Sequence, residues 1–234
     1  MDFTLILPCY NESEHLVASI EFIFRVLRLS RFTYEVLLID DASTDGTQKI
    51  IAKVIRRYQN VRAFYHKQNM GRGFTVSEGI RLARSKIVGY IDVDCEVSPV
   101  YIPLFVDTIM QNHADIVVAH RFYLFHINFR SIIRTISSRL YAWLVDLLLP
   151  MPIGDTEAGY KFFNRRKIIG ILDITEDRRW FWDTEILARS KGRLIVQEIP
   201  VFYSRNLNKT STVHLVRDSI KHLVSLIAYR MKFI

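Results

Sequence analysis

The sequence predicts a single α/β domain with a mostly parallel central sheet flanked by helices. Four short, largely apolar runs that contain β-branched residues indicate buried strands, at residues 3–7, 34–39, 61–65 and 87–91. A polar loop follows each run, and a helical pattern follows each of the first three loops. Strands that alternate with helices form parallel βαβ units, which bind ligands beyond the carboxyl ends of their strands. We therefore expect the polar loops to meet at one edge of the sheet.

The helices of the first three units are expected from their start signals. Asn11 and Glu14 have the spacing of a capping box, which would begin the first helix. Ser43 to Asp45 are expected to form an Asx turn and the cap of a second helix at about residues 48–58. The third helix should end near residue 84. With 234 residues and 50% hydrophobic composition, the chain can bury a sizeable core as one domain.

Asp92-Val93-Asp94 is the most informative motif of the chain, because it directly follows the last predicted strand. Carboxylates at positions i and i+2 of an extended chain point the same way, and together they can hold a hard divalent cation against phosphate oxygens. We interpret Asp92 and Asp94, with Glu96 nearby, as a site for Mg²⁺ or Mn²⁺ that bridges to a diphosphate. Taken alone, such a pair is also common among solvated turn residues.

The ordered motifs resemble those of family-2 glycosyltransferases of the GT-A fold, and within them the polyprenyl-phosphate sugar synthases such as dolichyl-phosphate glucose and mannose synthases. The resemblance covers nearly the whole chain and rests on ILPCYNE, DDASTDGT, NMGRG, DVDCEVSP, DTEAGYKFF and RWFWDTEILA. The sequence departs from the usual pattern at Ala42, where glycine is common, at Cys95-Glu96 and at Glu157-Ala158. The resemblance implies one GT-A domain, in which residues 1–120 bind the nucleotide sugar and metal and residues 121–234 bind the acceptor.

The same resemblance implies the activity and the site residues. The activity would be the transfer of a hexose, with inversion, from a nucleotide sugar to a polyprenyl or dolichyl phosphate. The RWFWDTE stretch favours UDP-glucose as the donor, with GDP-mannose second. The residues implied for nucleotide binding are Pro8, Tyr10, Glu12, Asp40, Asp41 and Asp92. Those implied for catalysis are Asp94, Arg121, Arg134 and Arg205. Those implied for acceptor binding are Arg121, Arg130, Arg134, Arg205 and Lys209.

An acceptor that is itself a phosphate needs no general base. Its second pKa is about 6, so at neutral pH most molecules already carry a nucleophilic dianion. What the site then needs is cationic positioning, and the planar fork of arginine binds phosphate oxygens bidentately. The roles of Asp155, Asp183 and Glu185 stay open. For Asp183 and Glu185, ion pairing with Arg178 or Arg179 fits the sequence as well as contact with the sugar or acceptor.

Three alternatives remain at this point. A glycosyltransferase of the same fold with a non-lipid saccharide acceptor would need a carboxylate base, for which Asp155 or Asp183 could serve. A non-catalytic, membrane-associated protein that binds nucleotide sugars is the second alternative. A dehydrogenase is disfavoured, because Gly71-Arg72-Gly73 lacks the third glycine of the dinucleotide fingerprint and follows the third strand.

Positive charge gathers in two segments of this basic chain, whose net charge is +8. Both segments contain amphipathic helical patterns, near residues 131–149 and 213–230. A basic amphipathic helix with Trp on its apolar side can lie in a membrane interface, although the same stripe can also pack on the sheet. The aromatic run at residues 122–129, directly before the first helix, favours membrane contact.

Other features lead us to expect a cytoplasmic protein that is peripherally associated with the membrane. The first residues show no signal-peptide pattern, and no stretch approaches the roughly 20 apolar residues of a spanning helix. The two cysteines, Cys9 and Cys95, are too few for a disulfide framework. Basic residues alternate with long aliphatic ones and no base-reading motif occurs, so we expect no nucleic-acid partner. The sequence leaves homo-oligomerisation open.

Overall fold

The computed structural model describes residues 1–123, 147–149, 151, 153–204 and 215–233. These residues form one seven-stranded sheet with helices on both faces, and the strand order is β3-β2-β1-β4-β6-β5-β7. The expected α/β class with a mostly parallel sheet is confirmed.

The first half of the chain alternates strands and helices as predicted. Its elements are β1 (Phe3–Cys9), α1 (Leu16–Leu29), β2 (Tyr34–Asp40), α2 (Thr47–Arg57), β3 (Val61–Tyr65), α3 (Arg72–Leu82) and β4 (Ile87–Ile91). The second half is less regular. Its elements are the 3-10 turn η1 (Pro99–Tyr101), α4 (Ile102–Met110), β5 (Ile116–Tyr123), β6 (Tyr160–Asn164), α6 (Arg165–Leu172), α7 (Trp182–Ser190), β7 (Val196–Tyr203) and α8 (Leu215–Phe233).

Strand β6 is the exception to the parallel pattern. It lies between β4 and β5 and runs antiparallel to both, whereas the pairs β1–β2, β1–β4, β2–β3 and β5–β7 are parallel. Ile91 at the end of β4 therefore pairs with Tyr160 at the start of β6. This reversal places residues just before β6 beside those just after β4, and Asp92 donates its backbone N–H to the carbonyl oxygen of Gly159 at 2.9 Å.

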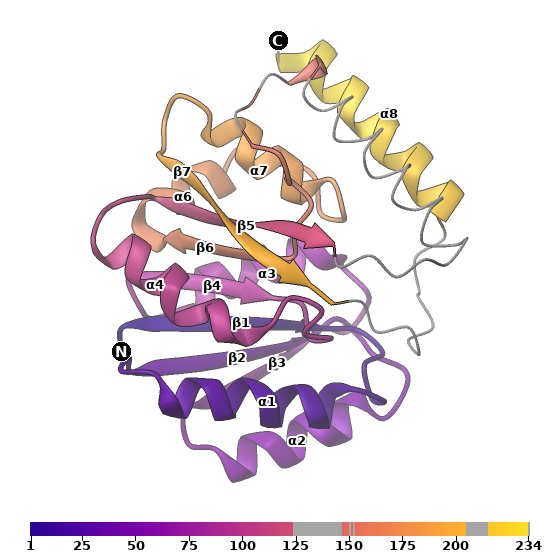
Figure 1. Ribbon diagram of the computed structural model, residues 1–234. Coiled ribbons are helices and arrows are strands. Elements are labelled where there is room, and N and C mark those ends of the chain that lie inside the picture. The colour runs from indigo at the N-terminus through magenta and orange to yellow at the C-terminus, as the bar shows by residue number, and fades with distance from the viewer. Residues whose placement is uncertain (124–146, 150, 152, 205–214, 234) are drawn as a thin grey trace.

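The core lies between the sheet and its two helical layers. Figure 1 shows α1, α2 and α4 on the viewer's side of the sheet and α3 behind it. The central strands are apolar on both faces, and Leu5 and Leu37 are fully buried. Helix α3 approaches the sheet closely at Gly79, where a Cβ atom would lie 2.8 Å from Ile6 and 2.9 Å from Ile39. A side chain there would force the helix or these two isoleucine side chains to shift.

The predicted capping box is wrong. Helix α1 begins at Leu16, and its N-cap residue His15 makes no side-chain capping bond. Asn11 has a φ of 55°, and its side-chain oxygen accepts the backbone N–H of Thr44 at 2.8 Å. The side chain of Asn11 thus binds the loop after β2 and does not cap helix α1.

The two amphipathic segments are described unequally. The helix predicted near 131–149 lies almost entirely outside the described residues, whereas the one predicted near 213–230 is seen as α8. Among the helices that the structure describes, none combines the length and the apolar composition needed to cross a bilayer.

Candidate active site

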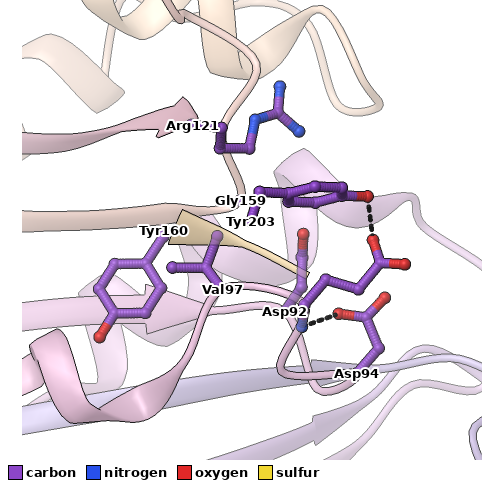
Figure 2. A pocket seen from close by; sticks show the side chains of 8 residues that line it. Asp92, Asp94, Val97, Arg121, Gly159, Tyr160 and Tyr203 are labelled. Carbon is purple, nitrogen blue, oxygen red and sulfur yellow. Dashed lines mark hydrogen bonds between the residues drawn. The ribbon is translucent and has the colours of Figure 1, made fainter. Parts of the chain in front are cut away.

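A small pocket of about 40 Å³ opens at the carboxyl edge of the sheet. Its walls come from the loop after β4, the end of β5, the start of β6 and the end of β7. Figure 2 shows the Tyr203 ring with Arg121 on one side and Asp92 and Asp94 on the other. The lining residues are Asp92, Asp94, Glu96, Val97, Arg121, Gly159, Tyr160 and Tyr203.

The three predicted metal-site residues share this pocket. The chain turns sharply after Asp94, since Cys95 has a φ of 54°, and Asp94 Oδ1 then accepts the backbone N–H of Glu96 at 3.3 Å. The Glu96 carboxylate accepts a hydrogen bond from the Tyr203 hydroxyl. Within the described part of the chain, no three His, Cys, Asp or Glu side chains are gathered as ligands of one ion. The three carboxylates therefore line one pocket but do not form a closed cage of ligands.

Arg121 is held by Asp155 on the opposite wall. The two side chains pair bidentately, with Nε at 2.7 Å and Nη2 at 2.9 Å from the carboxylate oxygens. Burial alone would raise the pKa of Asp155, but the Arg121 guanidinium outweighs it and holds the pKa below its usual value. Glu198 on β7 fixes Asp155 in turn, by accepting its backbone N–H at 2.9 Å. Asp155, left without a role by the sequence, thus orients a predicted phosphate-binding arginine.

Arg72, to which the sequence assigned no role, binds the first carboxylate of the metal motif. Its Nη2 and Nε donate to Asp92 Oδ1 at 2.7 and 3.1 Å, and its Nη1 donates to Asp183. The guanidinium also lies 5.2 Å from the Tyr90 ring and 5.5 Å from the Trp180 ring. One arginine therefore joins the end of β4 to the first turn of α7.

Lys161 completes this group of charges. It is fully buried on β6, and its Nζ donates to Asp183 at 2.7 Å, to the Ala158 carbonyl at 2.6 Å and to the Tyr90 hydroxyl at 3.2 Å. Tyr90 in turn donates to Asp183. We call the group the ion cluster, and its members are Asp92, Arg72, Asp183, Lys161 and Tyr90.

The structure gives Asp183 and Glu185 ion partners other than Arg178 and Arg179, which were one of the two possibilities left open by the sequence. Asp183 pairs with Arg72 and Lys161, as above, and Glu185 pairs with Arg189 at 2.6 Å. Glu185 also accepts backbone N–H groups from residues 176 and 177 at 3.0 and 2.7 Å. It thus fastens the loop before α7 and lies away from the pocket wall.

Two glycines permit this packing. Gly159 leaves no room for a side chain, because a Cβ atom would lie 1.8 Å from Asp92 Oδ2. Gly71 has a φ of 95°, and a Cβ atom there would lie 2.5 Å from the carbonyl oxygen of Arg178. The glycine before Arg72 therefore serves the approach of the loop before α7, which explains it without a dinucleotide fingerprint.

The loops after β1 and β2 are fastened to each other by backbone N–H groups that donate to short polar side chains. We call this arrangement, formed by residues 9–13 and 41–47, the two-loop lock. Besides the Asn11–Thr44 bond described above, its hydrogen bonds run from Asn11 N to Ser43 Oγ at 2.9 Å, from Glu12 N to Thr47 Oγ1 at 2.8 Å, and from Ser13 N to Asp45 Oδ2 at 3.0 Å. The predicted Asx turn is confirmed at Asp45, whose Oδ1 accepts the backbone N–H of Thr47 at 2.9 Å, and Ser43 N donates to Asp40 Oδ2 at 3.1 Å. The predicted side-chain cap is wrong, because the N-cap residue of α2 is Gly46 and makes no side-chain capping bond.

The two aspartates at the end of β2 differ in how far their carboxylate oxygens are hydrogen-bonded. Asp40 is fully buried, and its Oδ1 has no hydrogen-bond partner. Both oxygens of Asp41 are used, by the backbone N–H groups of Met70 and Gly71 at 2.7 and 2.9 Å and by His66 Nδ1 at 2.7 Å. A buried carboxylate oxygen without a partner is costly, and the oxygen of Asp40 is a candidate acceptor for a ligand N–H.

The other predicted nucleotide residues lie close by at the same strand ends. Pro8 is half-buried near the end of β1, the Tyr10 ring is 41% exposed, and Glu12 lies in the two-loop lock. The arginines and lysine predicted from the second half of the chain are not all visible. Arg130, Arg134, Arg205 and Lys209 lie outside the described residues.

Some of the missed residues carried signals in the sequence. Lys161 stands alone in an apolar strand, between Tyr160 and Phe162, which is typical of a buried lysine with a partner. Arg72 lies in the NMGRG motif at the start of a predicted helix, on the ligand-binding edge. Tyr203, whose ring lies 5.7 Å from the Arg121 guanidinium, carried no signal.

The chain has relatives among glycosyltransferases. The family model described as glycosyl transferase family 2 matches residues 4–171. Glycosyltransferase AglD of Haloferax volcanii is 27% identical over 221 residues, which cover 93% of this chain and 35% of AglD. The dolichyl-phosphate beta-glucosyltransferase of Dictyostelium discoideum is 30% identical over 212 residues, covering 85% of this chain and 65% of that protein. The chain thus spans about a third of the first relative and just under two thirds of the second.

A solved structure shares the fold. The glucosyl-3-phosphoglycerate synthase of Mycobacterium tuberculosis, in complex with Mn²⁺, UDP and glucosyl-3-phosphoglycerate, has a TM-score of 0.75 at 16% identity, over 97% of this chain and 79% of that one. This likeness concerns the fold alone, and it confirms the expected GT-A architecture. The family match runs from β1 into α6, over most of the sequence. The chain belongs to glycosyl transferase family 2.

Proposed function

We propose that this chain is a metal-dependent, inverting glycosyltransferase that moves a hexose from a nucleotide sugar to a polyprenyl or dolichyl phosphate. The observation that carries the proposal is the pocket itself, with Asp92 and Asp94 on one wall and Arg121 on the other. Opposite charges across one pocket suit a donor diphosphate held through a cation and an acceptor phosphate held by arginine.

The pocket suits a cation that is bound partly by protein carboxylates and partly by the phosphates of the nucleotide sugar. Mg²⁺ is usually bound through one or two carboxylates and completes its shell with water and substrate phosphate oxygens. Asp94, with Asp92 and Glu96 beside it, offers such a partial set of oxygens, in line with the lack of a closed three-residue cage among the described residues. A bound Mg²⁺ or Mn²⁺ would neutralise the negative charge that develops on the departing diphosphate.

The donor's nucleoside would lie along the ends of β1 and β2. Asp40 Oδ1 is buried and unpaired, so it can accept an N–H from the base. Pro8, Tyr10 and Glu12 would line the same cleft. Asp41 would shape it by holding the loop at Met70 and Gly71, to which both of its oxygens are bonded.

The acceptor's phosphate would bind at Arg121, with Arg134 and Arg205 as further contacts and Arg130 and Lys209 as weaker ones. Arg121 is already oriented by Asp155, so its fork is fixed before the acceptor arrives. Attack by a phosphate dianion on the anomeric carbon, from the face opposite the leaving group, would form the new C–O bond and release the nucleoside diphosphate. The product would have inverted stereochemistry at that carbon.

The state of the candidate bases favours a phosphate acceptor over a sugar hydroxyl. Burial alone would raise the pKa of Asp183, but Arg72 and Lys161 outweigh it and hold the pKa below its usual value. Asp155 is held low by Arg121 in the same way. A carboxylate with a depressed pKa is a weak base for a hydroxyl proton, whereas a phosphate dianion needs none.

The names of the relatives support the lipid acceptor and a glucose donor. The proteins of Dictyostelium discoideum and Saccharomyces cerevisiae are both described as dolichyl-phosphate beta-glucosyltransferases, and the latter is 25% identical over 99% of this chain and 75% of its own length. We therefore propose UDP-glucose as the first donor and GDP-mannose as the second.

The lipid acceptor implies work at a membrane surface, and α8 supports this. Leu226 and Tyr229 are buried against the protein, whereas Val224, Ile227 and Met231 are exposed on the other side. We propose that this apolar face inserts into the interface of an anionic membrane. The protein should then sediment with anionic liposomes at low ionic strength and be released by salt only in part. No sedimentation at low ionic strength would contradict peripheral binding.

The experiment that tests the activity is incubation of the purified chain with a panel of nucleotide sugars, Mn²⁺ and a polyprenyl phosphate, followed by mass measurement of the lipid. A gain of one hexose is expected, most rapidly from UDP-glucose. Asp94→Asn should reduce turnover by about 1,000-fold or more, since it removes several kcal/mol of charge stabilisation. Transfer to soluble sugars, with none to the lipid, would favour the non-lipid alternative. Absence of any turnover would favour a binding protein.

A further inference from the structure

The ion cluster does more than fill the space behind the pocket, because it ends on a pocket-lining carboxylate. Asp92 is the one member with a substantially exposed side chain, at 44%, and it lines the pocket. Arg72 is 12% exposed, Asp183 2% and Lys161 0%. A chain of charges therefore runs from the protein interior to the pocket.

Both sides of the Asp92 carboxylate are fixed by the protein. Oδ1 accepts two hydrogen bonds from Arg72, and Oδ2 lies against Gly159, where no side chain could fit. The aliphatic stem of Arg72 is flexible, and fixing its guanidinium costs rotamer entropy. Asp183 binds the other edge of the same guanidinium.

Asp183 is fixed by three side chains of the ion cluster. One of its oxygens accepts from Lys161 and Tyr90, and the other accepts from Arg72. Lys161 is anchored in turn by the Ala158 carbonyl, three residues before it. The alternating charges of Lys161, Asp183, Arg72 and Asp92 compensate one another, which makes their burial tolerable.

We propose that Asp183, with Lys161, is a positioning residue of the donor site, which acts through Arg72 to hold the Asp92 carboxylate in place for the cation and nucleotide. This inference rests on the proposed function, in that the ligand is a nucleoside diphosphate with a divalent cation. Partners that orient a metal-binding carboxylate usually change metal affinity by about 10- to 100-fold when they are removed.

The test is a double-mutant cycle on nucleotide affinity. The dissociation constants of UDP and of GDP, each with Mn²⁺, are measured by calorimetry for the wild-type chain, Asp183→Asn, Asp92→Asn and the double variant. If Asp183 acts through Asp92, Asp183→Asn should raise the constant by about 10-fold or more in the wild-type background and by less than about 2-fold in the Asp92→Asn background. Equal losses in both backgrounds, or no loss in either, would overturn the inference.

Two further variants keep the test decisive. Asp173→Asn is the matched control, because Asp173 forms an exposed pair with Arg81 at 2.7 Å, and it should leave the constant unchanged. If Asp183→Asn does not fold, Arg72→Lys takes its place in the cycle, since lysine keeps the charge and loses the fork. A wild-type chain that binds neither nucleotide with Mn²⁺ would overturn the proposed donor and this inference together, whereas a binding wild type with an additive cycle overturns only the inference.

Discussion

Two regions of the same sheet edge are held together by different kinds of interaction. At the ends of β1 and β2, the two-loop lock consists of backbone N–H groups that donate to short polar side chains. At the end of β4 and the start of β6, the ion cluster consists of charged side chains, one of which is fully buried. The first region would hold the nucleoside and the second the charged centre of the donor.

These different interactions predict different effects of substitutions on stability in the two regions. A single hydrogen bond of the lock contributes about 1 kcal/mol, and water can replace it where the bond is exposed, as between Ser13 and Asp45. In the ion cluster, each charge compensates its neighbours, so loss of one member leaves the others buried and unpaired. The lock should therefore tolerate substitution, and the cluster should not.

The largest effect is expected at the deepest charge of the cluster. Lys161→Met keeps most of the side-chain volume but leaves Asp183 without its cationic partner on β6. It should lower the free energy of unfolding by about 3–5 kcal/mol, measured by urea denaturation. Lys167→Met is the control, because Lys167 pairs with Asp115 but is 52% exposed, and it should cost less than about 1 kcal/mol. Similar losses in the free energy of unfolding for Lys161→Met and Lys167→Met would contradict the expectation that the ion cluster does not tolerate substitution.

Arg121 should show a functional effect, because it lines the pocket and its guanidinium is oriented there by Asp155. Arg121→Ala should lower kcat/KM for polyprenyl phosphate by about 100-fold, through the loss of charge-assisted hydrogen bonds to the acceptor. Donor affinity, measured by calorimetry, should change by less than about 2-fold, since the donor is held elsewhere. Arg121→Lys should rescue poorly. A strong loss of donor affinity would assign the arginine to the donor.

A smaller effect is expected inside the two-loop lock, at Ala42. Its φ is 61°, in the left-handed region that disfavours residues with a Cβ atom. Ala42→Gly should raise the free energy of unfolding by about 1 kcal/mol through relief of this strain. The control is Ala52→Gly, within α2, where no such strain exists. It should lower the free energy of unfolding by about 1 kcal/mol, because glycine gains conformational entropy in the unfolded chain. A loss of stability from Ala42→Gly would show that the lock depends on the alanine side chain.

The smallest effect should appear in acid. Burial raises the pKa of Asp45, but hydrogen bonds from Thr47 and Ser13 outweigh it and lower the pKa to about 2. Because the folded pKa lies below the usual 3.8, this stabilisation is present above pH 3.8 and is lost as the pH falls toward 2. Asp45 is exposed, so solvent limits the contribution to about 0.5 kcal/mol. Asp45→Asn should remove that part of the acid dependence in urea titrations between pH 4 and 2. An unchanged pH profile would contradict it.

The contrast between the two regions also explains what the sequence could predict. The strands and the edge at which their loops meet follow from local runs of residues, and the structure brings Asp92, Asp94, Glu96 and Arg121 to one pocket as the motifs suggested. The Asx turn at Asp45 was also predictable, because its donor Thr47 lies only two residues away. The functional roles of these residues stay predictions.

Interactions between distant residues escaped prediction. Arg72 and Asp183 are separated by 111 positions, and no local pattern says that the two meet. The reversed direction of β6 depends on which strand it joins, which its own five residues do not encode. The capping box was predicted wrongly at Asn11 for the same reason. Its side chain binds Thr44 in the loop after β2, and this contact competes with a local cap.

The reversed strand β6 has a further consequence, which concerns the order of folding. Strands β1 to β4 pair with one another and all precede residue 92, so they can form a half-sheet early. Strand β4 can pair with β6 only after residues 160–164 are present, and the ion cluster can form only after Asp183 is present. Contacts between distant segments are expected to form late in folding. Pulse-labelled hydrogen exchange during refolding should protect amides of β1 and β2 before those of β6, and simultaneous protection would contradict this order. During synthesis on the ribosome, the strand ends proposed to bind the nucleoside, those of β1 and β2, would thus form before the pocket proposed to bind the metal ion.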